Sequence, residues 1–207
     1  MSESVQGPVT HLLYLHGFRS SPKSFKAERL KAWLAADRPQ VHWWCPQLPP
    51  SPREAVALLR EGIADWPASS AVVGSSLGGF YATVVAESPG HETWRAVVMN
   101  PVVEPARDLA SYIGEQSAFH TPEERFYFRA EFIDELRALA PGPLTGRARY
   151  LPILATGDEV LSCQEMAARY AGEPLRLVQG SDHALSDFDE HLPSLLNHLS
   201  LWHSPCD

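Results

Sequence analysis

The sequence has few cysteines and no long apolar run, and both shortages exclude classes of protein. Its three cysteines, Cys45, Cys163 and Cys206, are odd in number, lie far apart and match no spacing of metal ligands. A reduced cytoplasmic protein without a metal centre is therefore the simplest expectation. No stretch approaches the ~18 consecutive apolar residues of a membrane span. The polar residues 1–7 include Glu3 and lack the basic and apolar regions of a signal peptide.

Positive charge is scarce as well. The chain has 17 lysines and arginines against 25 aspartates and glutamates, which gives a formal net charge of −8. This balance argues against nucleic acids and anionic membrane surfaces as partners. A length of 207 residues with 44% hydrophobic content is enough to bury one sizeable core, so we expect a single domain over residues 1–207. No motif indicates a cofactor, and the composition leaves the oligomeric state open.

Short apolar runs of the kind found in buried strands alternate with helical segments along most of the chain. A capping box at residues 51–54 (SPRE), with Ser51 as cap and Glu54 at the third helical position, predicts the start of one helix. Ser21 followed by Pro22 is typical of another helix start. Six buried-type strands that alternate with helices imply an α/β protein, with a parallel sheet covered by helices on both faces. The expected strands are 9–15, 41–45, 71–74, 95–99, 149–156 and 175–179, and the expected helices are 22–36, 52–65, 77–87, 164–171 and one near the C-terminus.

The alternation of strands and helices stops between residues 102 and 146. Within this segment, residues 121–124 (TPEE) form another capping box, which predicts a helix beginning there. The apolar stripe of that helix has spacings of 4, 4 and 3 residues and comprises Phe128, Phe132, Leu136 and Leu139. We therefore expect a helical insertion over residues 102–146 that could cover the functional site as a lid. The alternative is that the stripe packs as one more core helix.

The clearest motif follows the third apolar run. Residues 74–78 (GSSLG) match the G-x-S-x-G pattern of a nucleophile elbow, in which a strand turns sharply into a helix with a serine at the turn. Ser76 is the candidate nucleophile rather than Ser75, because only Ser76 has glycines two positions before and two positions after it. Such glycines give the strained turn room to pass its neighbours. A glycine-rich turn without chemistry, or an anion-binding loop, would show the same motif.

Candidate partners for Ser76 follow other strands. Asp158 comes after the fifth expected strand and His183 after the sixth. Because the carboxyl ends of parallel strands open on one edge of a sheet, these side chains are expected to converge there. A histidine that takes the proton of the serine, and a carboxylate that holds the imidazole, would make the serine a nucleophile. The backbone N–H groups of Phe18 and Leu77 are the expected donors to the oxyanion.

Neighbouring residues leave some assignments open. Glu159 adjoins Asp158 and is the alternative carboxylate, although Asp158 is favoured because it stands at the tip of the strand and has the shorter side chain. His16 is expected to hold its own loop through hydrogen bonds. The histidines nearest the C-terminus form no ligand cluster and are expected at the surface of the last helix: His191, His198 and His203.

Together these motifs resemble those of the small bacterial YqiA-type esterases. The resemblance spans residues 9–200 and rests on residues 14–24, 74–82, 100–101, 157–161 and 182–183. It implies a compact α/β-hydrolase that acts on acyl esters and thioesters and whose sheet lacks the first two strands of larger members. It also implies a catalytic triad of Ser76, Asp158 and His183.

We therefore expect a serine hydrolase that cleaves small to medium acyl esters through an acyl-serine intermediate, with a small-molecule ester or thioester as its partner. An acyl-CoA thioesterase with the same triad is the nearest alternative, in which Arg19 and Lys23 would bind CoA phosphates unless they are ordinary surface charges. A non-catalytic binding module on the same fold is a further alternative, and the complete set of triad residues argues against it. Two departures from the usual family pattern bear on substrate preference: Glu104 in place of an arginine, and Ser162-Cys163 in place of an acidic-aromatic pair.

Overall fold

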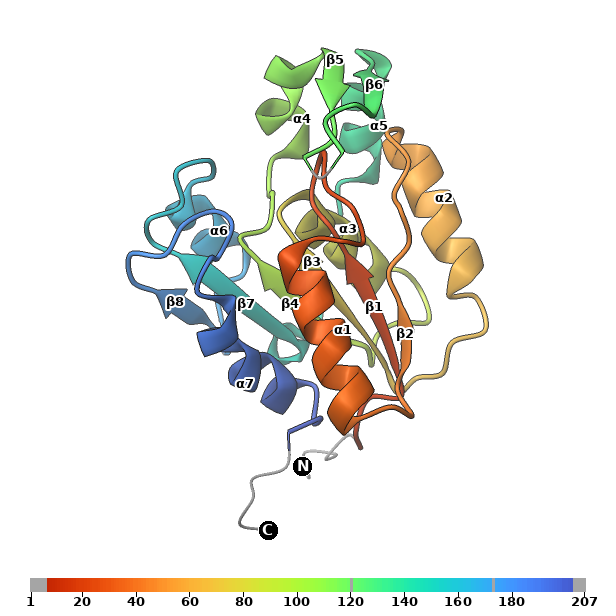
Figure 1. Cartoon of the computed structure of the whole chain (residues 1–207), viewed down its shortest axis with the longest axis vertical. Helices are drawn as coiled ribbons and strands as arrows, with labels where there is room; N and C mark the ends of the chain where they lie inside the picture. The colour runs from red at the N-terminus through yellow and green to blue at the C-terminus, as the bar shows by residue number, and fades with distance from the viewer. Residues whose placement is uncertain (1–6, 120, 173, 203–207) are drawn as a thin grey trace.

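The structure is a computed structural model that describes residues 7–119, 121–172 and 174–202 (Figure 1). It is built on a sheet of six parallel strands in the order β2-β1-β3-β4-β7-β8. Within this sheet, Leu13 of β1 pairs with Val72 of β3. The strands are β1 (His11–Leu15), β2 (His42–Trp44), β3 (Ser70–Ser75), β4 (Arg95–Met99), β7 (Tyr150–Ala155) and β8 (Arg176–Val178).

Helices cover both faces of this sheet, as Figure 1 shows. The helices are α1 (Phe25–Asp37), α2 (Pro52–Gly62), α3 (Leu77–Ala86), α5 (Glu131–Leu139), α6 (Cys163–Arg169) and α7 (Phe188–His198). Side chains alternate along β1, so that Leu13 and Leu15 belong to a core shared with α2, α3 and α5, whereas Leu12 and Tyr14 belong to a core shared with α1 and α7. The predicted parallel sheet with helices on both faces is therefore confirmed.

The capping box before α2 forms as predicted. The Ser51 hydroxyl accepts a hydrogen bond from the Glu54 N–H at 3.2 Å. Ser162 caps α6 in the same way, by accepting from the N–H three residues later at 3.3 Å. Each cap satisfies a backbone donor that the first turn of a helix leaves without an internal partner.

The first helix starts later than predicted. It begins at Phe25 and not at Pro22. The Ser21 hydroxyl accepts a hydrogen bond from the Lys23 N–H at 3.2 Å, and the Ser24 N–H donates to the Ser21 carbonyl at 3.0 Å. A serine side chain that bonds to nearby backbone stabilises a turn in place of a helix, which delays the helix by three residues.

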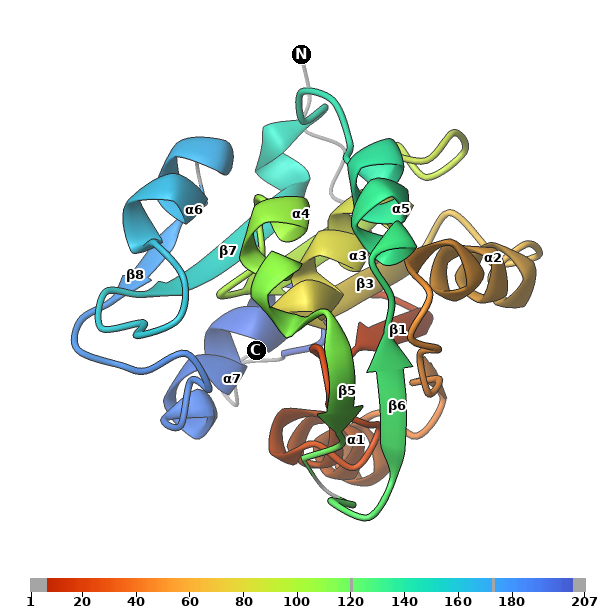
Figure 2. The same ribbon diagram turned by 90° about the horizontal axis from the view of Figure 1, so that it is seen from above.

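Residues 102–128, which carry a short helix and a two-stranded hairpin, lie above the carboxyl ends of the strands, and the chain after α5 runs back down beside α3 to the start of β7 (Figures 1 and 2). The whole segment 102–146 carries helices, as expected, but it also contains an antiparallel hairpin that the sequence interpretation missed. In chain order it consists of α4 (Pro105–Asp108), the 3-10 turn η1 (Ala110–Tyr112), the hairpin strands β5 (Gly114–Ser117) and β6 (Arg125–Phe128), and α5. We refer to residues 102–146 below as the insertion.

The prediction of a helix starting at the capping box of residues 121–124 is wrong. The Glu124 N–H donates to the Thr121 carbonyl at 2.8 Å, which closes a tight turn at this place. The next four residues (RFYF) have side chains that alternate between more and less exposed, and their aromatic content favours a strand. They form β6, and α5 starts only after it. Within α5, Phe132 and Leu136 keep the predicted apolar stripe buried.

Two histidines of α7 are not at the surface, contrary to the prediction. His191 is 3% exposed, and His198 is partly buried, with its Nε2 donating to the Arg149 carbonyl at 3.0 Å. Both lie on the same helical face as the buried Leu195, at spacings of four and three residues, and this face packs on the sheet. His203 lies outside the described residues. In the part of the chain that the structure describes, no helix has the length and apolar character needed to cross a membrane.

Candidate active site

A sharp turn between β3 and α3 places Ser76 at the carboxyl edge of the sheet. Its backbone has φ 56° and ψ −123°, a strained conformation for a residue other than glycine. The flanking glycines make this turn sterically feasible. A Cβ atom on Gly74 would collide with the Gly78 carbonyl, and a Cβ atom on Gly78 would collide with the Leu15 carbonyl. The glycines of the motif therefore explain why the serine can occupy this position.

His183 follows β8, Asp158 follows β7, and both meet Ser76 at this edge. His183 Nε2 lies 3.0 Å from Ser76 Oγ, and His183 Nδ1 lies 2.8 Å from Asp158 Oδ2. The fold thus brings together residues that are 107 and 25 positions apart in the sequence. When Nδ1 carries the proton and its N–H donates a hydrogen bond to the carboxylate, the Nε2 lone pair faces the serine hydroxyl.

The Asp158 carboxylate is enclosed by protein, with 0% of its side chain exposed. Its Oδ1 accepts hydrogen bonds from the N–H groups of Val160 and Leu161, at 2.8 and 2.7 Å. Burial by itself would raise the pKa of this carboxyl, but the hydrogen bonds from His183 and from the two backbone N–H groups outweigh burial and lower the pKa below its ordinary value. Asp158 is therefore ionised at neutral pH.

The loop that carries His183 is held by two polar side chains. Glu159 accepts a hydrogen bond from the His183 backbone N–H at 3.0 Å, so its carboxylate contacts the loop and Asp158 contacts the imidazole. Asn100, at the end of β4, is 0% exposed. Its Nδ2 donates to the carbonyls of Asp182 and His183 at 3.0 and 3.1 Å, and its Oδ1 accepts from the Ala155 N–H at 2.8 Å.

A third support for this loop comes from helix α1. Lys26 of α1 donates a hydrogen bond to the Ala184 carbonyl. Burial lowers the pKa of Lys26 to about 8, and the charge of Asp182 offsets part of this shift. Asn100 and Lys26 are supporting residues that were not among the sequence-based candidates for the site. A polar residue ending an apolar strand was a usable signal for Asn100, whereas Lys26 has no such signal.

The loop of residues 16–18 packs directly against Ser76. A Cβ atom on Gly17 would lie 3.1 Å from Ser76 Cβ, so glycine permits this close approach. His16 holds the loop, as expected. Its Nδ1 donates to the Gly17 carbonyl at 3.0 Å, and its Nε2 accepts from the Leu48 N–H at 3.2 Å.

Ser76 and His183 line a cavity of about 150 Å³ together with the two expected oxyanion donors, Phe18 and Leu77. Leu77 is the first residue of α3, where a backbone N–H has no partner within its own helix. The insertion contributes to the wall, and most of the lining is apolar. The other lining residues are Arg19, Val102, Asp108, Leu109, Tyr112, Phe119, Val160 and Leu161.

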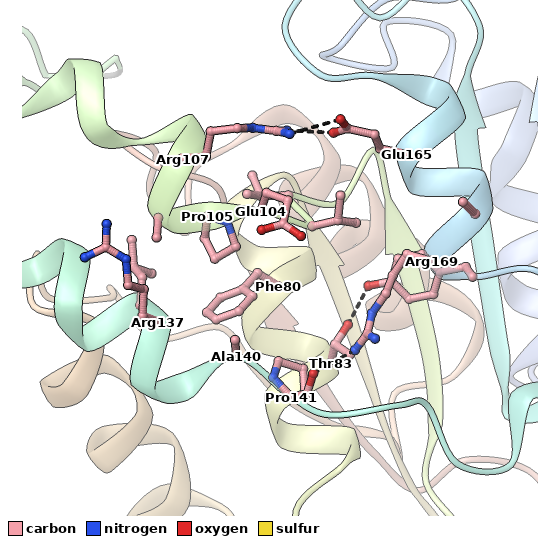
Figure 3. Close-up of a pocket in the computed structure, with 16 residues that line it drawn as sticks. Phe80, Thr83, Glu104, Pro105, Arg107, Arg137, Ala140, Pro141, Glu165 and Arg169 are labelled. Atoms are coloured by element: carbon pink, nitrogen blue, oxygen red, sulfur yellow. Dashed lines mark hydrogen bonds and ion pairs between the residues drawn. The ribbon is translucent and has the colours of Figure 1, made fainter.

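A larger cavity of about 580 Å³ lies between α3, α4, α5 and α6 (Figure 3). Arg107 and Glu165 bridge its rim with two hydrogen bonds of 2.9 and 2.6 Å. Glu104, which departs from the usual family pattern, also lines this cavity. Val102 lines both cavities, but Ser76 lines only the smaller one. The smaller cavity is therefore the candidate active site.

No group of three or more His, Cys, Asp or Glu side chains is placed to hold a metal ion within the described ranges 7–119, 121–172 and 174–202. Cys45 and Cys163 are free thiols. Burial raises the pKa of Cys45 to about 12 and also raises the pKa of Cys163 above its ordinary value. Cys206 lies outside the described residues. At the smaller cavity, the hydrogen-bonded Ser76, His183 and Asp158 are groups capable of nucleophilic and acid–base chemistry.

Solved structures share this architecture at low sequence identity. Alpha/beta hydrolase domain-containing protein 10 from mouse matches with a TM-score of 0.67 at 14% identity, over 94% of this chain and 92% of that one. A structure of the metagenome-derived lipolytic enzymes LipS and LipT matches with a TM-score of 0.68 at 16% identity, over 94% and 95% of the two chains. Tomato methylketone synthase I complexed with 2-tridecanone matches with a TM-score of 0.68 at 13% identity, over 94% and 99%. These likenesses establish the α/β-hydrolase fold.

A family model adds a relationship at the level of sequence. It matches residues 11–200, a span that includes Ser76, Asp158 and His183. The resemblance that the motifs predicted is therefore confirmed. The chain belongs to the uncharacterised protein family UPF0227, which is the YqiA family of esterases with an α/β-hydrolase fold.

Proposed function

We propose that this protein is a serine hydrolase that cleaves small acyl esters, with Ser76 as nucleophile, His183 as general base and Asp158 as the carboxylate that holds the histidine. The observation that supports this most strongly is the unbroken hydrogen-bonded chain, with 3.0 Å between Ser76 Oγ and His183 Nε2 and 2.8 Å between His183 Nδ1 and Asp158 Oδ2. Both distances lie within the reach of about 2.6–3.2 Å that proton transfer requires.

In the proposed first half of the reaction, Ser76 Oγ forms a bond to the carbonyl carbon of the ester, and its proton moves to His183 Nε2. The ionised Asp158 keeps the Nδ1 proton in place and stabilises the imidazolium. The tetrahedral intermediate then collapses and the ester C–O bond breaks. His183 gives the proton to the departing oxygen, so that an alcohol leaves and acyl-Ser76 remains.

In the second half, His183 Nε2 takes a proton from a water molecule whose oxygen attacks the acyl carbon. Collapse of this intermediate breaks the bond to Ser76 Oγ, which regains its proton from His183, and the acid is released. One water is consumed per ester. In both halves the backbone N–H groups of Leu77 and Phe18 would donate to the negatively charged oxygen, a role that fits their place beside Ser76.

The size of the cavity that Ser76 lines supports a short acyl chain beside the nucleophile, and a neighbouring cavity of about 410 Å³ shares Phe18, Arg19 and Leu77 with it. The volume of the cavity at Ser76, about 150 Å³, is well below the roughly 300–1,000 Å³ of pockets for drug-sized ligands. Its mostly apolar wall suits hydrocarbon better than a charged group. We further propose that residues 1–207 act as one hydrolase domain in which the insertion forms part of this wall, through Leu109, Tyr112 and Phe119.

The proposed function can be tested by labelling with a fluorophosphonate and by a panel of esters and thioesters of graded acyl length. The wild-type protein should be labelled on Ser76 and should hydrolyse the shortest oxygen esters fastest. Ser76→Ala should abolish both labelling and hydrolysis, whereas the matched control Ser75→Ala should keep the label on Ser76. A label on Ser75 in the wild-type protein, or undiminished hydrolysis by Ser76→Ala, would refute the proposal.

A further inference from the structure

Arg19 ties the loop after β1 to the hairpin of the insertion. Its Nε donates to the Ser117 carbonyl at 2.7 Å, and its Nη2 donates to the Ser117 hydroxyl at 3.3 Å. The guanidinium also lies over the ring of Phe119, 4.4 Å from the centroid. These contacts join residues that are 98 positions apart in the sequence.

The main chain of Arg19 takes part in the same connection. The Phe119 N–H donates to the Arg19 carbonyl at 2.8 Å. Arg19 has φ 60°, in the left-handed region that residues other than glycine seldom adopt. Such a conformation persists only where the surroundings impose it. The contacts with Ser117 and Phe119 supply that constraint, so the backbone at residue 19 is fixed by the hairpin.

The preceding residue is anchored to the same part of the molecule. The Phe18 ring meets three aromatic rings of the insertion edge-on, at centroid distances of 5.4 Å for Tyr112, 5.8 Å for Phe126 and 5.1 Å for Phe128. We call these three residues the aromatic cage. On the other side of Phe18, Gly17 packs against Ser76. The insertion therefore holds the segment whose N–H is the proposed oxyanion donor.

We propose that Arg19 and the aromatic cage are positioning groups that fix the Phe18 N–H for the oxyanion, so that the insertion sets the transition-state geometry of this hydrolase. This inference rests on the proposed function. An oxyanion donor must lie about 2.7–3.1 Å from the charge that develops in the transition state. A misplacement of about 1 Å can cost on the order of 10²-fold in rate. Arg19 needs no contact with the substrate to have this effect.

The test compares Arg19→Asn with the control Arg129→Gln. Asparagine tolerates the left-handed backbone but lacks the guanidinium. Arg129 is an exposed arginine of the insertion that pairs with Glu131 at 3.5 Å and lies 6.0 Å from the centroid of the Phe132 ring. Phe126→Leu loosens the aromatic cage at a residue that does not line the cavity at Ser76, and serves as an independent second variant.

For each variant, kcat and KM are measured on a short ester. Inhibition is measured with a trifluoromethyl ketone, which forms a negatively charged adduct with the serine, and with the matching methyl ketone. Melting curves identify variants that are not folded.

Arg19→Asn should lower kcat by roughly 10- to 100-fold and weaken the trifluoromethyl ketone by a similar factor. KM and methyl ketone inhibition should change by less than about 3-fold, because neither depends on the oxyanion. Phe126→Leu should act in the same direction, and Arg129→Gln should leave all values unchanged. A folded Arg19→Asn with normal kcat, or one whose loss is confined to KM and methyl ketone binding, would overturn the inference and leave the proposed function standing. A wild-type protein that neither hydrolyses esters nor reacts at Ser76 would overturn both.

Discussion

Replacing Asp158 with asparagine should leave the fold intact and lower kcat by about 10⁴-fold. In the wild-type protein, Oδ1 accepts hydrogen bonds from the N–H groups of Val160 and Leu161, at 2.8 and 2.7 Å, while Oδ2 faces His183 Nδ1 at 2.8 Å. Asparagine has only one oxygen. The two backbone donors hold that oxygen at the place of Oδ1, because the opposite orientation would set an NH₂ group against two N–H groups. The NH₂ group must then face the imidazole.

An NH₂ group opposite Nδ1 requires Nδ1 to accept a hydrogen bond, so the single proton of the neutral ring moves to Nε2. Nε2 then donates to Ser76 Oγ and can no longer take its proton. The loss of about 10⁴-fold corresponds to about 5.4 kcal/mol of transition-state stabilisation. Very little of it should come from unfolding, since asparagine has almost the same shape as aspartate.

The assay is kcat on a short ester, with Glu159→Gln as the matched control. The glutamine keeps an oxygen that can accept from the His183 N–H, a contact of 3.0 Å in the wild-type protein. Its loss should therefore stay below about 10-fold. Both variants should melt within a few degrees of the wild-type protein. A folded Asp158→Asn with kcat within about 10-fold of wild type, or a greater loss in Glu159→Gln, would refute the reasoning.

Three other changes probe the core, the cavity and the charge of the site. Phe128 is 1% exposed, so Phe128→Ala should lower the free energy of unfolding in urea by about 3–5 kcal/mol, and a loss under about 1 kcal/mol would contradict its core position. Leu109→Ala should enlarge the cavity and raise kcat/KM for a hexanoyl ester relative to a butyryl ester, whereas an unchanged ratio would show that the acyl chain lies elsewhere. The folded-state pKa of Asp158 is lowered, so its stabilisation is present above the unfolded pKa of about 3.9 and is lost as pH falls through the folded value. Asp158→Asn should therefore lose less stability than the wild-type protein between about pH 5 and pH 2, and equal losses would contradict the lowered pKa.

The sheet and the candidate triad could be predicted because each depends on short stretches of sequence. β3 has six buried residues around the apolar run 71–73, and the glycine-flanked Ser76 follows it directly. Parallel strands then place Asp158 and His183 at the same edge without any knowledge of their contacts. The choice of Asp158 over Glu159 required an additional judgement about side-chain direction. In the structure the difference arises from the turn at Val160 and Leu161, whose N–H groups hold the Asp158 carboxylate.

The insertion could not be predicted in the same way, because its structure depends on contacts between distant residues. The sequence of residues 121–128 carries two conflicting signals, a capping box followed by an aromatic strand-forming run. The strand forms because it pairs with β5 and because Phe128 contacts the ring of Phe18, a residue far away in the sequence. Arg19 likewise looked like a surface charge in the sequence. Its bond to Ser117 spans 98 positions, and no local pattern reports such a contact.

Backbone strain occurs both at Ser76, which a local motif identifies, and at residues such as Arg19 whose conformation depends on distant contacts. Among the described residues, those other than glycine that have positive φ are Arg19, Ser76, Asn100, Leu185 and Ser200. Arg19 adjoins Phe18, the proposed oxyanion donor, and Ser76 is the proposed nucleophile. Asn100 holds the loop that carries His183, and Leu185 follows His183 by two residues. Each strained conformation costs about 1–3 kcal/mol and persists only under constraint. That constraint comes from packing and hydrogen bonds with segments far away in the sequence, such as Ser117 for Arg19 and Ala155 for Asn100. A fold optimised for stability alone would not gather this strain at one edge of its sheet, so its concentration there is independent support for chemistry at that edge.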